Sequence, residues 1–300
     1  MEGGRKLGEG CSRSNVAVEF RNFSFTYRDG SSPALRGLNL CLSAGEFHLI
    51  VGASGSGKTS LIRSVIGLIP HFYRGTMTGE VYVMGVPVSK SSIREIASHV
   101  GYVFQDPENQ LLAFTAGRDV AASLESRGIP PDRAEDTARA ILRDLDAENL
   151  FEMPVHELSD GQRQRVAIAG EIARNPEILL LDEPSSMLDP AAAEGLMVLL
   201  DRLRRRNGLT LVLVEHRLGP ALPLADNVVV LRNGSILASG PPRDLMGEWS
   251  SVVKLKSAGV DVPPVIQVYH RLRFSGMDIG EVPLSVKELV QGILNTSLNP

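Results

Sequence analysis

The pattern of apolar and polar positions predicts that the chain opens with strands. Residues 16–27 alternate apolar and polar side chains at a period of two, as in a strand with one buried face, and turn-forming residues follow them. Residues 46–52 are almost wholly apolar and are expected to form a strand buried on both faces. We therefore expect an antiparallel sheet at the start and then the first strand of a buried sheet.

Further along the chain, short apolar runs alternate with amphipathic segments. Predicted strands cover residues 80–85, 100–104, 177–182 and 209–216, and predicted helices cover residues 58–69, 117–145, 161–174 and 190–206. Pro130 and Pro131 break the second of these helices. Regular alternation of strands and helices is typical of a mostly parallel sheet, so the expected fold class is α/β. Residues 226–240 are predicted to close this core as a hairpin, because Asn233-Gly234 lies between two apolar runs.

The same pattern divides the chain into regions. Residues 265–276 and 285–294 carry two more helical patterns, so residues 246–300 are predicted to form a small C-terminal helical appendage. The core domain is assigned to residues 16–245, with a helical insert at about residues 106–170. Residues 1–15 are small, polar and rich in glycine, and we expect a disordered tail there.

Composition and charge exclude some classes of protein. The 300 residues are 43% hydrophobic, which is enough for a packed core, and the formal net charge is −4 with mixed signs. Nucleic acid is therefore not an expected partner, because proteins that bind it normally carry a basic surface. The apolar runs at residues 178–181 and 209–214 are far shorter than the roughly 18 residues of a membrane-spanning helix. The start of the chain has no apolar run typical of a signal peptide, so an intracellular protein is expected.

A glycine-rich loop is the first motif that indicates chemistry. Residues 52–59, GASGSGKT, match the phosphate-binding pattern G-x-x-x-x-G-K-[ST] between a predicted strand and a predicted helix. Backbone N–H groups of such a loop surround a triphosphate, Lys58 reaches the β- and γ-phosphates, and the Thr59 hydroxyl binds Mg²⁺. The candidate ATP-binding residues of this phosphate loop are Gly52, Ser54, Gly55, Ser56, Gly57, Lys58, Thr59 and Ser60. The alternative is a surface turn rich in glycine and serine.

Two carboxylates follow a buried strand in the sequence ILLLDEP, residues 178–184. The C-terminal end of a parallel strand is the usual ligand edge of an open α/β sheet. Asp182 is expected to hold Mg²⁺, and Glu183 is expected to be the general base for an attacking water. Lys58 and Glu183 are thus the first catalytic candidates. The alternative is a solvated strand end.

The sequence LSDGQRQRVAIAGEIA, residues 158–173, resembles the signature of the ABC ATPase family, which reads LSGGQ. The resemblance implies a P-loop NTPase core with a helical signature subdomain. It also implies that Ser159, Gly161 and Gln162 contact the γ-phosphate of ATP held by a partner subunit. Asp160 stands where the family has its first glycine. We interpret Asp160 as a helix cap, because a carboxylate that faced the triphosphate would repel it.

Four other positions fall in the order that this family has. The resemblance implies that Gln105 touches Mg²⁺ and ATP, and that Asp189 lies at the dimer seam. It implies that His216 is a catalytic residue that contacts the γ-phosphate, and that Tyr27 stacks on adenine. The alternatives are a polar strand end for Gln105, a helix N-cap for Asp189, a buried structural histidine for His216 and core packing for Tyr27.

A narrower resemblance concerns the ATPases of energy-coupling factor (ECF) transporters, which import vitamins and transition-metal ions. It rests on VFQDPENQL at residues 103–111, on EHRL at residues 215–218 and on the C-terminal appendage. The partners that it implies are a second ABC ATPase subunit, identical or homologous, a transmembrane coupling protein and a small integral substrate-binding protein. It also implies a location at the cytoplasmic face of the cell membrane and an appendage that stabilises the ATPase dimer.

Other functions remain as alternatives. A soluble ABC ATPase of DNA repair would need a long coiled coil between its phosphate loop and its signature, and the interval from Lys58 to Ser159 has no room for one. A cassette that binds ATP without hydrolysing it is favoured only by Asp160. Within transporters, the alternatives are the ATPase of a conventional importer with a periplasmic binding protein and, less in keeping with the motifs, that of an exporter.

Overall fold

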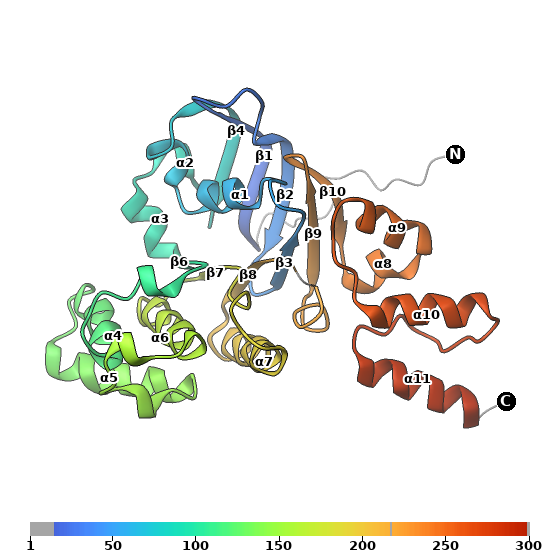
Figure 1. The fold of residues 1–300 in the computed structure, drawn as a ribbon. Coiled ribbons are helices and arrows are strands. Elements are labelled where there is room, and N and C mark those ends of the chain that lie inside the picture. The colour runs from blue at the N-terminus through green and yellow to red at the C-terminus, as the bar shows by residue number, and fades with distance from the viewer. Residues whose placement is uncertain (1–14, 217, 299–300) are drawn as a thin grey trace.

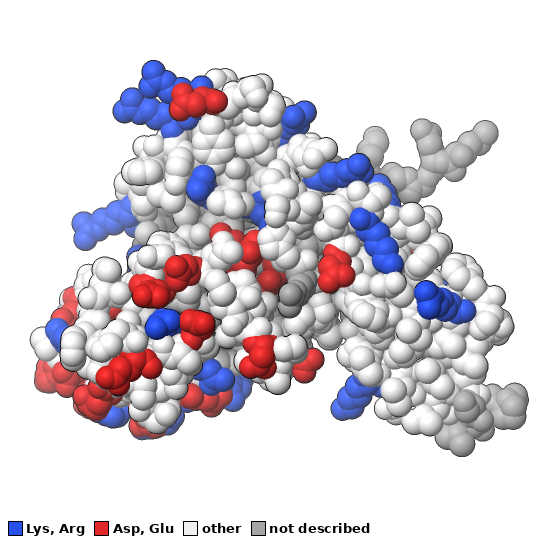
Figure 2. Space-filling model, in the orientation of Figure 1, with Lys and Arg blue, Asp and Glu red and all other residues white. Residues whose placement is uncertain are grey.

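A computed structural model describes residues 15–216 and 218–298 of the chain, so residues 1–14 of the predicted tail lie outside it. Figure 1 shows two sheets near the centre, a helical group that contains α4, α5 and α6 on one side, and the C-terminal helices on the other. Charged side chains of both signs are scattered over the face drawn in Figure 2, and acidic ones gather over the helical group. None of the helices in the described part combines the length and the hydropathy that crossing a membrane requires.

The smaller sheet is antiparallel and has the strand order β2-β1-β4-β5. Its strands are β1 (Val16–Tyr27), β2 (Leu35–Ser43), β4 (Gly75–Val83) and β5 (Val86–Pro87). The predicted N-terminal antiparallel sheet is therefore confirmed. Strand β2 was not predicted. Leu38, Leu40 and Leu42 keep a period of two, but the buried Leu35 is out of step with them, because the register shifts near Gly37, which has φ +54°.

The larger sheet has the strand order β10-β9-β3-β8-β7-β6. Its strands are β3 (Phe47–Val51), β6 (Val100–Val103), β7 (Ile178–Asp182), β8 (Thr210–Glu215), β9 (Asn227–Arg232) and β10 (Ser235–Gly240). All neighbours are parallel except β9 and β10, which form the predicted hairpin. Every residue of β3, β7 and β8 is buried, so the mostly parallel α/β core is confirmed.

Side chains from this sheet alternate between two hydrophobic clusters, one on each face. Leu179 and Leu181 of β7 pack with the helical group and the C-terminal helices, whereas Ile178 and Leu180 pack with the smaller sheet. Helices α1 (Lys58–Val65), α2 (Leu68–His71), α3 (Ile93–His99) and α7 (Pro190–Asn207) surround the core. The helical group contains α4 (Ala116–Glu125), α5 (Pro131–Asp144) and α6 (Asp160–Ala173), and the predicted break at Pro130–Pro131 separates α4 from α5.

The C-terminal part contains α8 (Pro242–Gly247), α9 (Trp249–Ser257), α10 (Pro264–Phe274) and α11 (Val286–Leu298). Helices α10 and α11 confirm the two predicted helical patterns, whereas α8 and α9 were not predicted. Buried residues such as Met246, Leu255 and Ile266 belong to the same hydrophobic cluster as β7 and α7, so these helices pack continuously with the core. The domain boundaries and the dimer-stabilising role of the appendage stay predictions.

Candidate active site

The phosphate loop connects the end of β3 to the start of α1, as the sequence predicts. Gly57 precedes α1 at φ +110°, and a Cβ atom there would lie 2.9 Å from the Ala34 carbonyl oxygen. At Gly52 a Cβ atom would lie only 2.4 Å from the Leu231 carbonyl oxygen. Both positions therefore require glycine, because a side chain would displace backbone. These glycines therefore allow the backbone of the phosphate loop to pack closely against neighbouring backbone atoms.

Lys58 is folded into the loop that it follows. Its side chain is almost fully buried, and Nζ donates hydrogen bonds to the carbonyl oxygens of Gly52 at 2.8 Å and Ala53 at 3.2 Å. Burial lowers the pKa of the Lys58 ammonium, while the nearby carboxylates of Glu183 and Asp182 oppose that shift. Lys58 is thus a cation buried in the phosphate loop, where carbonyl oxygens and two nearby carboxylates offset its charge.

The hydroxyl groups of the loop have different surroundings. Ser54 and Thr59 are exposed, whereas the Ser56 Oγ is buried without a hydrogen-bond partner within the described chain. Ser60 lies within α1, and its Oγ is 3.0 Å from the Tyr27 hydroxyl. An orphaned buried hydroxyl in a loop of this sequence is available to a bound ligand or to water.

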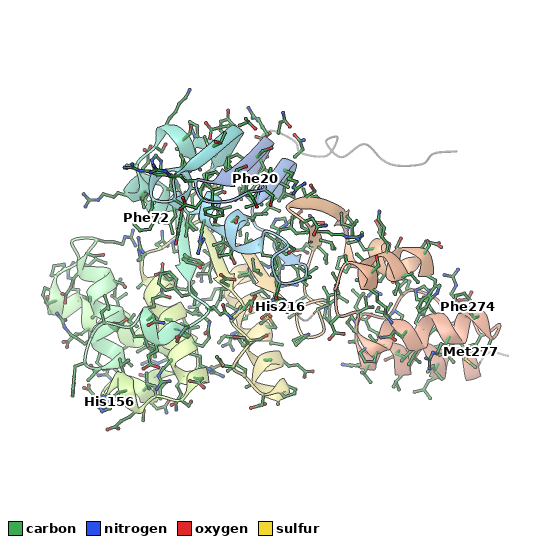
Figure 3. The ribbon with its side chains drawn as sticks, turned by 45° about the horizontal axis from the view of Figure 1, so that its top comes forward. Phe20, Phe72, His156, His216, Phe274 and Met277 are labelled. Atoms are coloured by element: carbon green, nitrogen blue, oxygen red, sulfur yellow. The ribbon has the colours of Figure 1, made fainter. Side chains whose placement is uncertain are left out.

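Glu183 lies between two of the predicted site residues. Gln105 Nε2 donates to Glu183 Oε2 at 3.1 Å, and His216 Nε2 lies 2.7 Å from Glu183 Oε1. The Glu183 backbone has φ +49°, and its N–H donates to the Val214 carbonyl oxygen at 2.8 Å. Positive φ at a residue with a side chain is strained and is often found at functional sites. Figure 3 shows His216 near the centre of the molecule.

Asp182 precedes Glu183 at the end of β7. Its Oδ2 accepts a hydrogen bond from the Tyr102 hydroxyl at 3.3 Å. Burial raises the pKa of the Asp182 carboxyl, and the neighbouring Glu183 carboxylate adds to that shift. Burial also raises the pKa of the Tyr102 hydroxyl, so it remains a donor. Tyr102 was not predicted, because nothing in the sequence indicates that β6 lies beside β7.

Glu215 is a second residue for which no role was predicted, although it begins the segment EHRL at residues 215–218. It closes β8 immediately before His216, is buried, and accepts hydrogen bonds from the N–H and the hydroxyl of Ser185, at 3.1 and 2.6 Å. Ser185 lies in the loop between Glu183 and Asp189. Glu215 therefore ties this loop to the strand that carries His216. A charged residue closing an otherwise apolar strand was the available signal.

Replacing Glu215 by glutamine is expected to raise the melting temperature Tm, increasingly so at higher pH. Burial raises the pKa of the Glu215 carboxyl above its ordinary value of 4.5, so the folded state binds the proton more tightly than the unfolded state. The tighter proton binding stabilises the folded chain at pH values below the ordinary pKa, and this stabilisation is lost as the pH rises through the folded-state pKa. Glutamine keeps an oxygen acceptor for Ser185 without the charge. Thermal unfolding of both proteins, from below the ordinary pKa to above the folded-state pKa, tests the expectation. A difference in Tm between Glu215→Gln and wild type that does not change with pH would contradict it.

Tyr27 lies at the end of β1 beside α1. Its hydroxyl accepts a hydrogen bond from Arg63 Nη1 at 3.0 Å in addition to its contact with Ser60. Its ring packs edge-to-face against Phe25 and Tyr73, with centroid distances of 4.9 and 5.9 Å. The core-packing alternative is thus confirmed in part, because the ring is half-buried among aromatic neighbours. The adenine contact stays a prediction.

The cap of the signature helix differs from the prediction. Ser159, not Asp160, is the N-cap of α6, and the Ser159 N–H donates to Gln162 Oε1 at 2.9 Å. Asp160 is already inside the first turn, where its Oδ1 accepts a hydrogen bond from Arg163 Nη1 at 2.9 Å. The capping interpretation of Asp160 was therefore wrong, because serine takes that position one residue earlier. The N-cap alternative for Asp189 is confirmed, since its Oδ1 accepts from the Ala192 N–H at 3.0 Å.

The signature and the phosphate loop of one chain are not brought together. Among residues 15–216 and 218–298, no hydrogen bond or ion pair joins residues 158–162 to residues 52–59. The signature instead borders a cavity of about 200 Å³ between the start of α6 and the loops after β6 and β7. This cavity is lined by residues that include Gln105, Asp160, Arg163, Ser186 and Leu188. A Cβ atom at Gly161 would lie 3.4 Å from Leu188 Cδ2, which is an ordinary contact distance.

Comparison with known proteins identifies the family. The ABC transporter family matches residues 35–186. The energy-coupling factor transporter ATP-binding protein EcfA1 of Caldanaerobacter subterraneus subsp. tengcongensis is 35% identical over 280 residues, which cover 92% of this chain and 98% of that protein. EcfA1 of Lactobacillus acidophilus is 35% identical over 273 residues, covering 91% and 93%. Three other ABC transporter ATP-binding proteins are longer, and the matches span only 44% to 48% of their length.

Solved structures agree with this result. The structure of cbiO1 from Clostridium perfringens, described as part of the ABC transporter complex cbiONQ, superposes with a TM-score of 0.73 at 28% identity, covering 85% of this chain and 99% of that one. The dimeric, post-hydrolysis ATP-binding cassette MJ0796, bound to ADP and Pi, gives a TM-score of 0.66 at 30% identity, covering 75% and 99%. The chain therefore belongs to the ATP-binding proteins of the ABC transporter family, with a P-loop ATPase fold and similarity to the ATPases of ECF transporters.

Proposed function

We propose that this chain is the ATP-hydrolysing subunit of an ECF-type ABC transporter that imports a vitamin or a transition-metal ion. The observation that carries the proposal is the Glu183 carboxylate, which Gln105 and His216 hold next to Asp182 at the carboxyl edge of the core sheet. The names of the EcfA1 relatives support the transporter type. A non-hydrolysing switch would not need both carboxylates and His216 at one edge.

Hydrolysis by these residues follows from their chemistry. Glu183 would accept a proton from the attacking water, and His216, 2.7 Å from its carboxylate, would orient that water and the γ-phosphate. Lys58 and the N–H groups of the phosphate loop would stabilise the negative charge on the transferred phosphoryl group. Tyr27 would stack on the adenine, since its ring lies next to the helix that follows the loop.

The oxygen donors in this region fit Mg²⁺. They are the Thr59 hydroxyl at the start of α1, the Asp182 carboxylate at the end of β7 and the side-chain carbonyl of Gln105. Mg²⁺ typically takes one or two carboxylates together with substrate phosphates and water, and this set matches that preference. When bound, Mg²⁺ would neutralise charge on the β- and γ-phosphate oxygens.

A second ATPase subunit would complete each site. The signature residues Ser159, Gly161 and Gln162 make no hydrogen bond or ion pair with the phosphate loop within the described part of their own chain, which supports a role in contacting ATP bound to a partner. Met187, in the loop before Asp189, is 69% exposed, as expected of a residue that a partner covers. The partner is the same chain or a homologue.

Membrane partners are proposed at the helical group. Leu112 and Phe114 are 91% and 74% exposed, and they follow the loop of Gln105 by only a few residues. Exposed apolar side chains this close together commonly mark a protein contact. We assign this surface to a transmembrane coupling protein, which would also bind a small integral substrate-binding protein. The chain would then lie peripherally at the cytoplasmic face of the membrane.

Affinity purification of this chain from gently solubilised membranes tests the proposal. We expect the tagged wild type to recover one transmembrane coupling protein and small integral substrate-binding proteins, identified by mass spectrometry. The variant Leu112→Asp/Phe114→Asp should lose them, whereas Val198→Asp, at a 61% exposed position on α7, should keep them. Recovery of a conventional permease pair would assign the chain to ordinary transporters instead. Recovery of no membrane protein by the wild type would contradict a role in transport.

A further inference from the structure

Strand β6 forms one edge of the core sheet, and side chains pair with its free backbone groups. The Tyr102 N–H donates to Glu171 Oε2 at 3.3 Å, and the Tyr102 carbonyl oxygen accepts from Gln110 Nε2 at 3.1 Å. The Phe104 N–H donates to Gln110 Oε1 at 3.1 Å. Two side chains thus take the place of a neighbouring strand along the segment that leads to Gln105.

The two side chains also bind each other and join separate parts of the fold. Gln110 Nε2 donates to Glu171 Oε1 at 2.9 Å, and Glu171 is 8% exposed on α6, the signature helix. Helix α6 packs closely here, because a Cβ atom at Gly101 would lie 3.2 Å from the Glu171 Cβ. Arg174 donates to Glu171 Oε2 at 3.4 Å and to the Ala97 carbonyl oxygen at 3.2 Å, so the buried carboxylate has a charged partner.

Residues 102–105, which Gln110 and Glu171 hold, make two contacts with the carboxylates at the end of β7. Its Tyr102 hydroxyl reaches Asp182, and Gln105, directly after Phe104, reaches Glu183. A shift of residues 102–105 would therefore move the partners of both carboxylates. Small misplacements of groups that orient reacting atoms can reduce a rate strongly.

We propose that Gln110 and Glu171 are positioning residues for ATP hydrolysis, acting as a latch that fixes residues 102–105 against the signature helix. Neither side chain lies at the catalytic carboxylates, and both act through the backbone of β6. The kinetic part of this inference rests on the proposed ATPase function. The structural part concerns only the Tyr102 and Phe104 amides and is tested without ATP.

Kinetic measurements test the positioning role. Glu171→Leu and Gln110→Leu are each expected to lower kcat for ATP about tenfold, the effect of losing a buried hydrogen bond to a charged group, while KM stays within about twofold. The double variant should lose little more than either single variant, because both remove the same latch. Gln110→Glu alone places two carboxylates together and should be impaired. Adding Glu171→Gln removes the repulsion and should restore kcat in part, because the Tyr102 carbonyl oxygen still lacks its donor. Glu194→Leu, at an exposed position on α7, is the control.

Hydrogen exchange of the nucleotide-free, full-length protein gives a readout independent of activity. Glu171→Leu should speed exchange of the Tyr102 amide, and Gln110→Leu that of the Phe104 amide, each about tenfold. The amides of Leu180 and Val212, inside β7 and β8, should be unchanged. Glu171→Gln keeps an acceptor and should leave the Tyr102 amide protected, which covers the case in which the leucine variant does not fold.

The outcomes separate this inference from the proposed function. Unchanged exchange at both amides would overturn the latch, whatever the ATPase rate. Faster hydrogen exchange with wild-type kcat would overturn the positioning role of the latch. A variant with a lower Tm, and a kcat that the double variant Gln110→Glu/Glu171→Gln does not restore at all, would overturn it too. A wild type without ATPase activity would overturn the proposed function, while the exchange result would still decide whether the latch exists.

Discussion

Replacing Glu183 by glutamine is expected to lower steady-state ATP hydrolysis by about 10²- to 10⁴-fold, the usual contribution of a positioned general base. Glutamine has the size of glutamate and offers hydrogen-bond partners for Gln105 and His216, which contact the two carboxylate oxygens at 3.1 and 2.7 Å. The positions of Gln105, His216 and the side chain at residue 183 should therefore be preserved. What is lost is the ability to accept a proton from water. ATP binding, which depends on the phosphate loop, should remain.

This separation of binding from hydrolysis should trap the ATP-bound pair of subunits. If each ATP lies between the phosphate loop of one subunit and the signature of the other, a dimer that cannot hydrolyse ATP stays closed. Phosphate release and size-exclusion chromatography with and without ATP measure the two effects. Glu194→Gln, at an exposed position on α7, is the matched control and should behave as wild type. Near-normal turnover by Glu183→Gln would falsify the assignment of the base.

The part of the fold that the sequence predicts is the part specified locally. The buried strands before Gly52 and before Glu183 are almost wholly apolar runs, and the hairpin at Asn233-Gly234 is signalled by its turn residues. The phosphate loop is likewise a local pattern of glycines whose spacing follows from close backbone approach, as at Gly57. Such features need no knowledge of which elements are neighbours in space.

The contacts that organise the site are not local, and they were not predicted. Tyr102 meets Asp182 only because β6 and β7 are adjacent in the sheet, although 80 positions separate them. Gln110 meets Glu171 across 61 positions for the same kind of reason. The cap at Ser159 shows a different limit, since serine and aspartate both favour that position and only the backbone decides between them.

Replacing Lys58 by methionine is expected to abolish ATP binding while leaving the nucleotide-free protein folded, with a Tm close to that of the wild type. Burial lowers the pKa of the Lys58 ammonium, so in the absence of ATP the folded state favours the charged form less than the unfolded state does. Stability from such a group is present above the unfolded-state pKa and decreases as the pH falls through it toward the folded-state pKa. At neutral pH, removing the buried charge therefore relieves a desolvation cost, which opposes the loss of the hydrogen bonds that Nζ donates to the Gly52 and Ala53 carbonyl oxygens. Methionine keeps much of the apolar stem that is buried beside the loop.

Lys58 therefore matters more for ATP affinity than for the stability of the nucleotide-free chain, and thermal unfolding can measure both. ATP at about 100 times its Kd should stabilise the wild type by about 2.7 kcal/mol and raise its Tm, because ATP binds only the folded state. Lys58→Met should show no such rise, and a fluorescent ATP analogue should not bind it. Lys90→Met, at an exposed position, should keep the full rise. If ATP raised the Tm of Lys58→Met as much as that of the wild type, the cation in the loop would not be the group that binds the phosphates.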